Sequence, residues 1–144
     1  HATLYDFGVL TSIMHMMWMK YVCGRLKSDY RYSNKIVYNN FPWPLNPTEK
    51  QKEKVKKLAQ KVLDVRAKYP DSSLAILYNP ETMPADLTKT HNELDKAVDA
   101  CYGKKSFASA TERMEFLFNL YERYTTPLIK PKKEHKKKSA KRNE

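Results

Sequence analysis

The sequence is poor in glycine, and this scarcity excludes one class of site. Only three glycines occur in 144 residues, Gly8, Gly24 and Gly103. Nucleotide and dinucleotide loops place several glycines close together, because only glycine lets the backbone approach a phosphate closely. No such loop can be built from these three positions, so we expect no catalytic loop of that kind.

Cysteine is also scarce, and the few metal-ligating side chains are badly spaced for a metal. Cys23 and Cys101 each lie inside an apolar pattern. Buried free thiols are expected there, which agrees with a reducing cytoplasm. His15, His91 and His135 share no metal-ligand spacing with either thiol. We therefore predict a cytoplasmic chain with no metal site, and we expect His91, on the apolar face of its helix, to be a core residue with a hydrogen-bond partner.

Long apolar runs are missing as well. The most apolar stretch, Ile13 to Cys23, is too short to cross a bilayer, and no signal peptide is visible, so no membrane partner is expected. Only His15 and Lys20 are polar within it, so a helix here needs cover on nearly every side. Either this helix is central to the fold, or part of the surface that covers it lies upstream. Since the chain has no initiator methionine, we expect it to begin inside a larger protein.

Positive charge, by contrast, is abundant and unevenly spread. The net charge is +11, and a basic surplus of this size predicts an anionic partner, most often nucleic acid. Residues 1–46 carry five Lys/Arg against two Asp/Glu, residues 47–129 fourteen against twelve, and residues 130–144 eight against two. We expect the last part to be a disordered basic tail that either adds nonspecific phosphate binding or only keeps the chain soluble.

The pattern of the first 46 residues predicts a short helix and a small β portion. The apolar stretch from Ile13 to Cys23 is read as a helix capped by Thr11 or Ser12, and residues 7–10 as the end of a strand. Arg25–Tyr32 and Lys35–Tyr38 are read as two strands in a hairpin-like arrangement, joined by turn-forming residues.

A proline-rich connector follows the predicted strands. Prolines at 42, 44 and 47 end regular structure and favour an extended chain, which we expect Phe41 and Trp43 to anchor on both sides. We place the main boundary of the chain here, between residues 46 and 47.

Beyond the boundary the pattern predicts a compact helical unit. Thr48 with Gln51 and Ser109 with Glu112 form capping boxes at two helix starts. Gly103 is a predicted C-terminal cap. The acids Glu93, Asp95 and Asp99 lie off the apolar stripe of their helix and are read as a solvated face. The fold class predicted for the whole chain is therefore mainly α with a small β portion.

One stretch, "GRLKSDYRYS", suggests a chemical role. As a strand it places Arg25, Lys27, Asp29 and Arg31 on a single face. Lysine donates well to guanine O6 and N7, and aspartate accepts from cytosine N4, so Lys27 and Asp29 together could read one G·C pair. The alternative is a surface ion pair between the two, which would contribute little to stability. Spacing alone leaves both open.

Longer stretches show a family resemblance. "FGVLTSIMHMMWMKYVCGRLKSDYRYSNKIVYNNFPWP" resembles the end of the target-recognition domain of MmeI-type (type IIL) restriction–modification enzymes and related adenine-specific DNA methyltransferases. "RAKYPDSSLAILYNPETMPADLTKTHNELDKAVDACYG" and "ERMEFLFNLYERY" are similar to the helical C-terminal domain of that family. The resemblance covers residues 1 to about 124, and the basic tail lies outside it.

The resemblance implies a parent enzyme larger than this chain. Family members join an S-adenosylmethionine-dependent methyltransferase domain to a recognition domain and a helical domain, some with an N-terminal nuclease, and methylate adenine within a short asymmetric DNA site. This sequence lacks the cofactor-binding and Asn-Pro-Pro-aromatic motifs. We therefore expect a C-terminal fragment with no catalytic residue or cofactor of its own, whose partners are double-stranded DNA and the missing methyltransferase domain. The oligomeric state stays open.

The resemblance also implies roles for particular residues. Lys27 and Asp29 match the family's specificity pair for one base position, and this favours base readout over the ion pair. Weaker candidates for DNA backbone contacts, chosen by position and charge, are Arg25, Tyr30, Arg31, Ser33 and Lys35. Residues 47–129 are expected to clamp the recognition domain to the methyltransferase core. The competing interpretation is a non-enzymatic helical interaction module that binds nucleic acid or an acidic protein nonspecifically.

Overall fold

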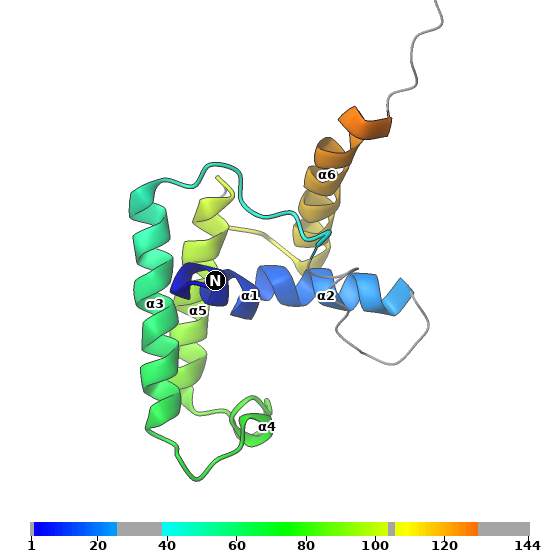
Figure 1. Ribbon diagram of the computed structural model, residues 1–144. Coiled ribbons are helices and arrows are strands. Elements are labelled where there is room, and N and C mark those ends of the chain that lie inside the picture. Colours follow the sequence, from blue (N-terminus) through cyan, green and yellow to red (C-terminus); the bar gives the residue numbers. More distant parts are fainter. Residues whose placement is uncertain (1, 26–38, 104–105, 130–144) are drawn as a thin grey trace, which may run out of the picture.

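The computed structural model describes residues 2–25, 39–103 and 106–129 (Figure 1). This part of the chain is helical and contains no strand. Its helices, in chain order, are α1 (Leu4–Thr11), α2 (Ile13–Arg25), α3 (Glu49–Ala67), α4 (Leu74–Leu77), α5 (Ala85–Cys101) and α6 (Ala110–Ile129). Within the same residues, no helix combines the length and the apolar character needed to span a membrane.

The predicted β portion is wrong for the residues that the structure describes. Residues 7–10, expected to end a strand, lie in α1, and Arg25, expected to begin one, ends α2. The remainder of the predicted hairpin, residues 26–38, lies outside the described residues. The apolar run before Gly24 contains no proline, and each residue added to an existing helix gains a hydrogen bond, so α2 continues past Cys23.

The start of the chain is a helix because its first turn is capped twice. The Thr3 side chain accepts a hydrogen bond from Asp6 N, and the Asp6 side chain accepts one from Thr3 N. α1 then lies close to α3 at Gly8, where an added Cβ would come within 2.6 Å of Val55 Cγ1. Glycine at this position is therefore required by close packing between two helices.

α3 and α5 lie side by side and run in opposite directions (Figure 1). The predicted Thr48–Gln51 capping box opens α3, as expected. Gly103, just beyond the end of α5, has a φ of +78°, which confirms the predicted glycine cap. Each helix buries an ordinary apolar stripe; the buried apolar residues are Val55, Ala59, Val62 and Val65 on α3 and Leu87, Leu94, Ala97, Val98 and Cys101 on α5.

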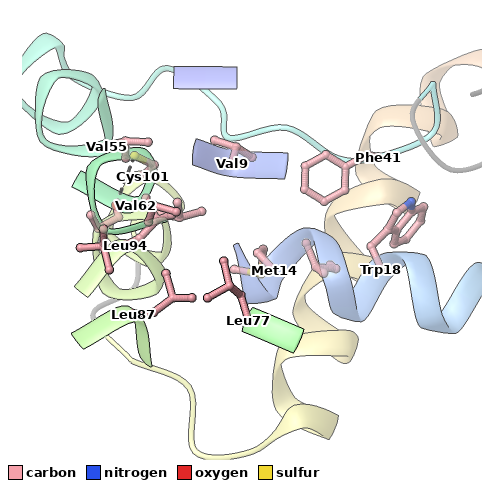
Figure 2. Close-up of a cluster of buried hydrophobic side chains, with 14 residues drawn as sticks. Val9, Met14, Trp18, Phe41, Val55, Val62, Leu77, Leu87, Leu94 and Cys101 are labelled. Atoms are coloured by element: carbon pink, nitrogen blue, oxygen red, sulfur yellow. Dashed lines mark hydrogen bonds between the residues drawn. The ribbon is translucent and has the colours of Figure 1, made fainter. Parts of the chain in front are cut away.

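One hydrophobic cluster joins the two sides of residue 46 (Figure 2). Figure 2 shows Trp18 and Phe41 together at one end of this cluster and the valine and leucine side chains of α3 and α5 at the other. α2 is thus central to the fold, with Met14, His15 and Trp18 buried. Its other side is open, since Ile13 and Met16 are 40% and 41% exposed.

Candidate nucleic-acid interface

The predicted base-reading pair lies between two described parts of the chain. We call residues 26–38 the recognition segment; it lies outside the described residues, and so do the predicted site residues Lys27, Asp29, Tyr30, Arg31, Ser33 and Lys35. Of the predicted backbone contacts, only Arg25 falls in a described helix, as the last residue of α2. What the structure describes is how the chain is held on either side of the recognition segment.

After the recognition segment, the chain returns to the body at Phe41. Phe41 is 4% exposed, and its ring contacts those of His15 and Trp18 edge-on, with centroid distances of 4.7 and 6.4 Å. Trp43 packs against Phe41 in the same way, at 5.5 Å. The prediction that Phe41 and Trp43 anchor the connector is therefore confirmed. Burial lowers the pKa of His15 to about 4, so its imidazole is neutral at pH 7.

Two tyrosine hydroxyls bind successive carbonyls of this connector. Tyr102, just after α5, donates from Oη to the Pro42 carbonyl at 2.8 Å. Tyr124, on α6, donates from Oη to the Trp43 carbonyl at 2.9 Å. Burial raises the pKa of both phenols, so both remain protonated donors at any physiological pH.

Before the recognition segment, α2 is held by aromatic contacts with α6. The indole of Trp18 is 3% exposed and lies 5.6 Å from the Tyr121 ring. One turn further along α2, the Tyr21 ring lies 6.2 Å from that of Phe118. α6 therefore contacts the chain on both sides of the recognition segment.

The beginning of α2 is held by a carboxylate from α5. Asp95 Oδ1 accepts a hydrogen bond from Ile13 N at 2.9 Å, which satisfies one of the free N–H groups of the first turn. Burial raises the pKa of Asp95 to about 6, although this hydrogen bond lowers it. The prediction that Asp95 lies on a solvated face is wrong, because its side chain is partly buried against the start of α2.

Asp99 is buried, again contrary to the prediction of a solvated face. It accepts two hydrogen bonds from the Arg113 guanidinium of α6, from Nη1 to Oδ1 and from Nη2 to Oδ2, the latter at 3.2 Å. Arg113 in turn lies 4.6 Å from the centre of the Phe107 ring, and its Nη1 is 3.8 Å from Met14 Sδ. This ion pair therefore joins α5, α6 and α2 in the interior. Asp99 and Arg113 lie on two different helices, so the local spacing of the sequence does not predict that they form a pair.

The polar groups inside the described body join helices to one another. No group of three or more His, Cys, Asp or Glu side chains is placed to hold a metal ion in this part of the chain. His91, predicted as a core residue with a partner, has its Nε2 2.7 Å from Tyr78 Oη, and Arg66 Nε donates to the same hydroxyl. Through Tyr78, those contacts tie α3 to α5.

Comparisons with known proteins agree with this arrangement. The MmeI target recognition domain model matches residues 1–45, and the MmeI C-terminal domain model matches residues 47–129. A curated relative, DNA methyltransferase A of Bacillus subtilis (strain 168), is 44% identical over 124 residues, which is 86% of this chain. A solved structure of the type IIL restriction–modification enzyme MmeI in complex with DNA is 48% identical, with a TM-score of 0.80 over 87% of this chain.

This chain spans only 14% of the length of the curated relative and 17% of the chain in that structure. Two family models nevertheless match consecutive parts of it, residues 1–45 and residues 47–129, and they meet within the connector. The chain belongs to the MmeI family, with residues 1–45 in its target recognition domain and residues 47–129 in its C-terminal domain.

Proposed function

We propose that this chain is the C-terminal part of a DNA methyltransferase of the restriction–modification type, and that its recognition segment reads one base pair of the DNA target. The observation that carries this proposal is the succession of a recognition-domain match and a C-terminal-domain match along one chain. The similar MmeI structure was solved in complex with DNA, which supports double-stranded DNA as the partner.

Base readout is assigned to Lys27 and Asp29. A lysine ammonium donates to guanine O6 and N7 in the major groove, and a carboxylate accepts from the N4 amino group of the paired cytosine. A carboxylate beside the phosphates would weaken a purely electrostatic contact, so its presence favours a contact with bases. The supporting backbone contacts proposed are Arg25, Tyr30, Arg31, Ser33 and Lys35.

The same proposal gives each part of the chain a role. Residues 1–46 form the distal part of the recognition domain, residues 47–129 clamp it to the methyltransferase core, and residues 130–144 are a basic tail. The parent enzyme is proposed to act in the cytoplasm, transferring the methyl group of S-adenosylmethionine to N6 of an adenine that is flipped out of the duplex. The sequence has only three glycines and lacks the family's cofactor-binding motif, so binding of that cofactor is assigned to the methyltransferase domain of the parent enzyme.

Substitutions at two lysines of the recognition segment test the proposal. In the intact protein, Lys27→Ala should reduce discrimination at one base pair by about 1–3 kcal/mol, because one bidentate base contact is lost. Lys35→Ala should instead weaken binding to all sequences and reduce the salt dependence of binding, as expected for a phosphate contact. Both effects are measured by titrating target duplexes, each with one altered base pair, at several salt concentrations.

The outcome of that titration separates the proposal from its alternative. If Lys27→Ala leaves the preference at every base pair unchanged, the chain does not read DNA through this residue. If the intact gene product also fails to protect plasmid DNA by methylation, the chain is a nonspecific interaction module.

A further inference from the structure

We infer that four exposed lysines of the C-terminal domain bind phosphates of duplex DNA, whatever its sequence. We call them the lysine patch; they are Lys50, Lys54 and Lys57 on α3 and Lys96 on α5. The inference rests on the proposed function, since it takes double-stranded DNA as the partner. It goes further because it gives residues 47–129, which that proposal treats only as a clamp, a DNA contact of their own.

The positive charge of this domain is concentrated on one helix. α3 carries seven Lys/Arg against three Asp/Glu, although residues 47–129 as a whole carry only fourteen against twelve. Figure 1 shows α3 at an outer edge of the described body, where it packs against α1 and α5. A domain that is close to neutral therefore presents one basic edge.

Three members of the lysine patch form a stripe along α3. Lys50, Lys54 and Lys57 follow one another after four and three residues, and this spacing places them on the same face of the helix. All three side chains are exposed. With a rise of about 1.5 Å per residue, the stripe extends over about 10 Å of the helix axis. B-DNA carries about one negative charge per 1.7 Å of its axis, so several phosphates lie within that length.

Lys96 adds a fourth positive charge from the neighbouring helix. Two contacts define the side of α5 that borders α3: Glu93 Oε2 lies 3.1 Å from Lys61 Nζ, and the Ala100 carbonyl accepts a hydrogen bond from Gln51 Nε2 at 3.0 Å. Lys96 comes three residues after Glu93 and four before Ala100, so it lies on the same face of α5, between these two contacts. Its exposed side chain is therefore beside the stripe on α3.

The lysine patch differs from the other lysines of α3 because it has no acidic partner. The other lysines of this helix and of its C-terminal end each form an ion pair: Lys52 with Glu49, Lys56 with Glu53, Lys61 with Glu93 and Lys68 with Asp86. No Asp or Glu among the described residues forms an ion pair with the lysine patch. Like charges four residues apart, such as Lys50 and Lys54, destabilise a helix, so stability does not account for the stripe. A polyanion would supply the missing negative charge, and the similar MmeI structure is a complex with DNA.

The test replaces the whole lysine patch with glutamine in the intact protein, which removes four charges and keeps good helix formers. Binding is titrated at several salt concentrations to a duplex that contains the target site and to a duplex of the same length without it. Because phosphate contacts do not depend on sequence, the affinity for both duplexes should fall by the same factor. The slope of log affinity against log salt concentration should become shallower by about one for each lysine that contacts a phosphate.

The matched control replaces the four ion-paired lysines, Lys52, Lys56, Lys61 and Lys68, with glutamine. It removes the same number of charges from the same part of the protein, but these lysines already bind carboxylates. The control should therefore keep a salt slope close to that of the wild type. Both variants alter only the surface, so their melting temperatures should stay near the wild-type value.

The inference and the proposed function fail in different ways. If the patch variant changes the salt slope no more than the control does, or loses affinity for the target duplex alone, the lysine patch does not bind phosphates and the inference is overturned. In that case Lys27→Ala still reports on base readout in the same titration. A shallower slope for the patch variant, together with an unchanged base preference in Lys27→Ala, would reject base readout and support the inference. A wild-type protein that binds neither duplex would overturn both.

Discussion

The α3–α5 pair and the junction of α2, the connector and α6 are held together in different ways. α3 and α5 pack mainly through apolar stripes, with hydrogen bonds from Tyr69 to Asp86 and from Arg66 through Tyr78 to His91, and with exposed ion pairs such as Lys61 with Glu93 at 3.1 Å. At the junction, the contacts are aromatic edges, tyrosine hydroxyls and the buried Asp99–Arg113 pair. The first region relies mainly on burial of apolar area, whereas the second buries a charged pair and holds two main-chain carbonyls through tyrosine hydroxyls.

The two regions also differ in what they hold. The α3–α5 pair lies in the body that is proposed to clamp one domain to another, which needs area and stability, and apolar stripes supply both. The junction holds the chain on either side of the recognition segment, where hydrogen bonds of fixed direction set a defined position. Variants in each region should therefore differ in the size of their effect on stability and in the contacts that they disturb.

The strongest test of the junction is Arg113→Ala. Removing the guanidinium leaves the Asp99 carboxylate buried without its counter-ion, and this should lower the free energy of unfolding by about 3–5 kcal/mol in denaturant titrations. The matched control is Lys61→Ala, which breaks an exposed ion pair of the α3–α5 pair and should cost less than about 1 kcal/mol. Equal losses for both variants would contradict a distinct, directional junction.

Apolar packing against α3 is tested from α1 by Gly8→Ala. In an open helix this change stabilises by about 0.5–1 kcal/mol, because alanine loses less chain entropy than glycine. Here the new methyl group would lie 2.6 Å from Val55 Cγ1, so we expect destabilisation of about 1–3 kcal/mol instead. In a Val55→Ala background, where the crowded methyl group is absent, Gly8→Ala should cost less stability than it does in the wild type. A more stable Gly8→Ala protein would show that α1 does not approach α3 so closely.

A smaller, pH-dependent effect is expected for Asp95→Asn. The folded pKa of Asp95, about 6, lies above its unfolded value of 3.8, so the charged carboxylate costs stability as the pH rises from about 4 to about 6. Asparagine removes that cost and still offers an oxygen to Ile13 N. Relative to wild type, the variant should therefore gain about 1–2 kcal/mol between pH 4 and pH 7.

His15 changes stability with pH in the direction opposite to Asp95, and this makes the difference between the two proteins easier to detect. Its folded pKa, about 4, lies below the ordinary value of 6.5, so it destabilises the fold as the pH falls from about 6.5 to 4. In Asp95→Asn that loss is no longer offset, and stability should rise more steeply with pH than in wild type. Parallel stability profiles for the two proteins would show that Asp95 does not titrate as a buried group.

Local signals predicted the first region well. The Thr48–Gln51 capping box, the glycine cap at Gly103 and the apolar stripes of α3 and α5 all act within a turn or two of the chain, and the structure confirms them. At the start of α6, Ser109 Oγ accepts a hydrogen bond from Glu112 N as predicted, while the Glu112 carboxylate accepts one from Ala108 N.

The junction could be predicted only in part, because its partners are distant in sequence. Aromatic and proline content identified Phe41 and Trp43 as anchors, but no local pattern shows that Tyr102 and Tyr124 bind the connector. Asp99 was misread for the same reason, since an acid beside an apolar stripe is solvated unless a base from another helix meets it. The predicted strand at Arg25 was wrong because alternating polarity over a few residues is also compatible with a helix end.

The central claim is that Lys27 and Asp29 select one base pair of the target, and sequencing of modified bases tests it most directly. DNA from cells that express the intact protein should carry modified adenines within a site that has G·C at one fixed position, and Lys27→Ala should make that position degenerate while the others stay fixed. An unchanged modified site in the Lys27→Ala protein would contradict the claim.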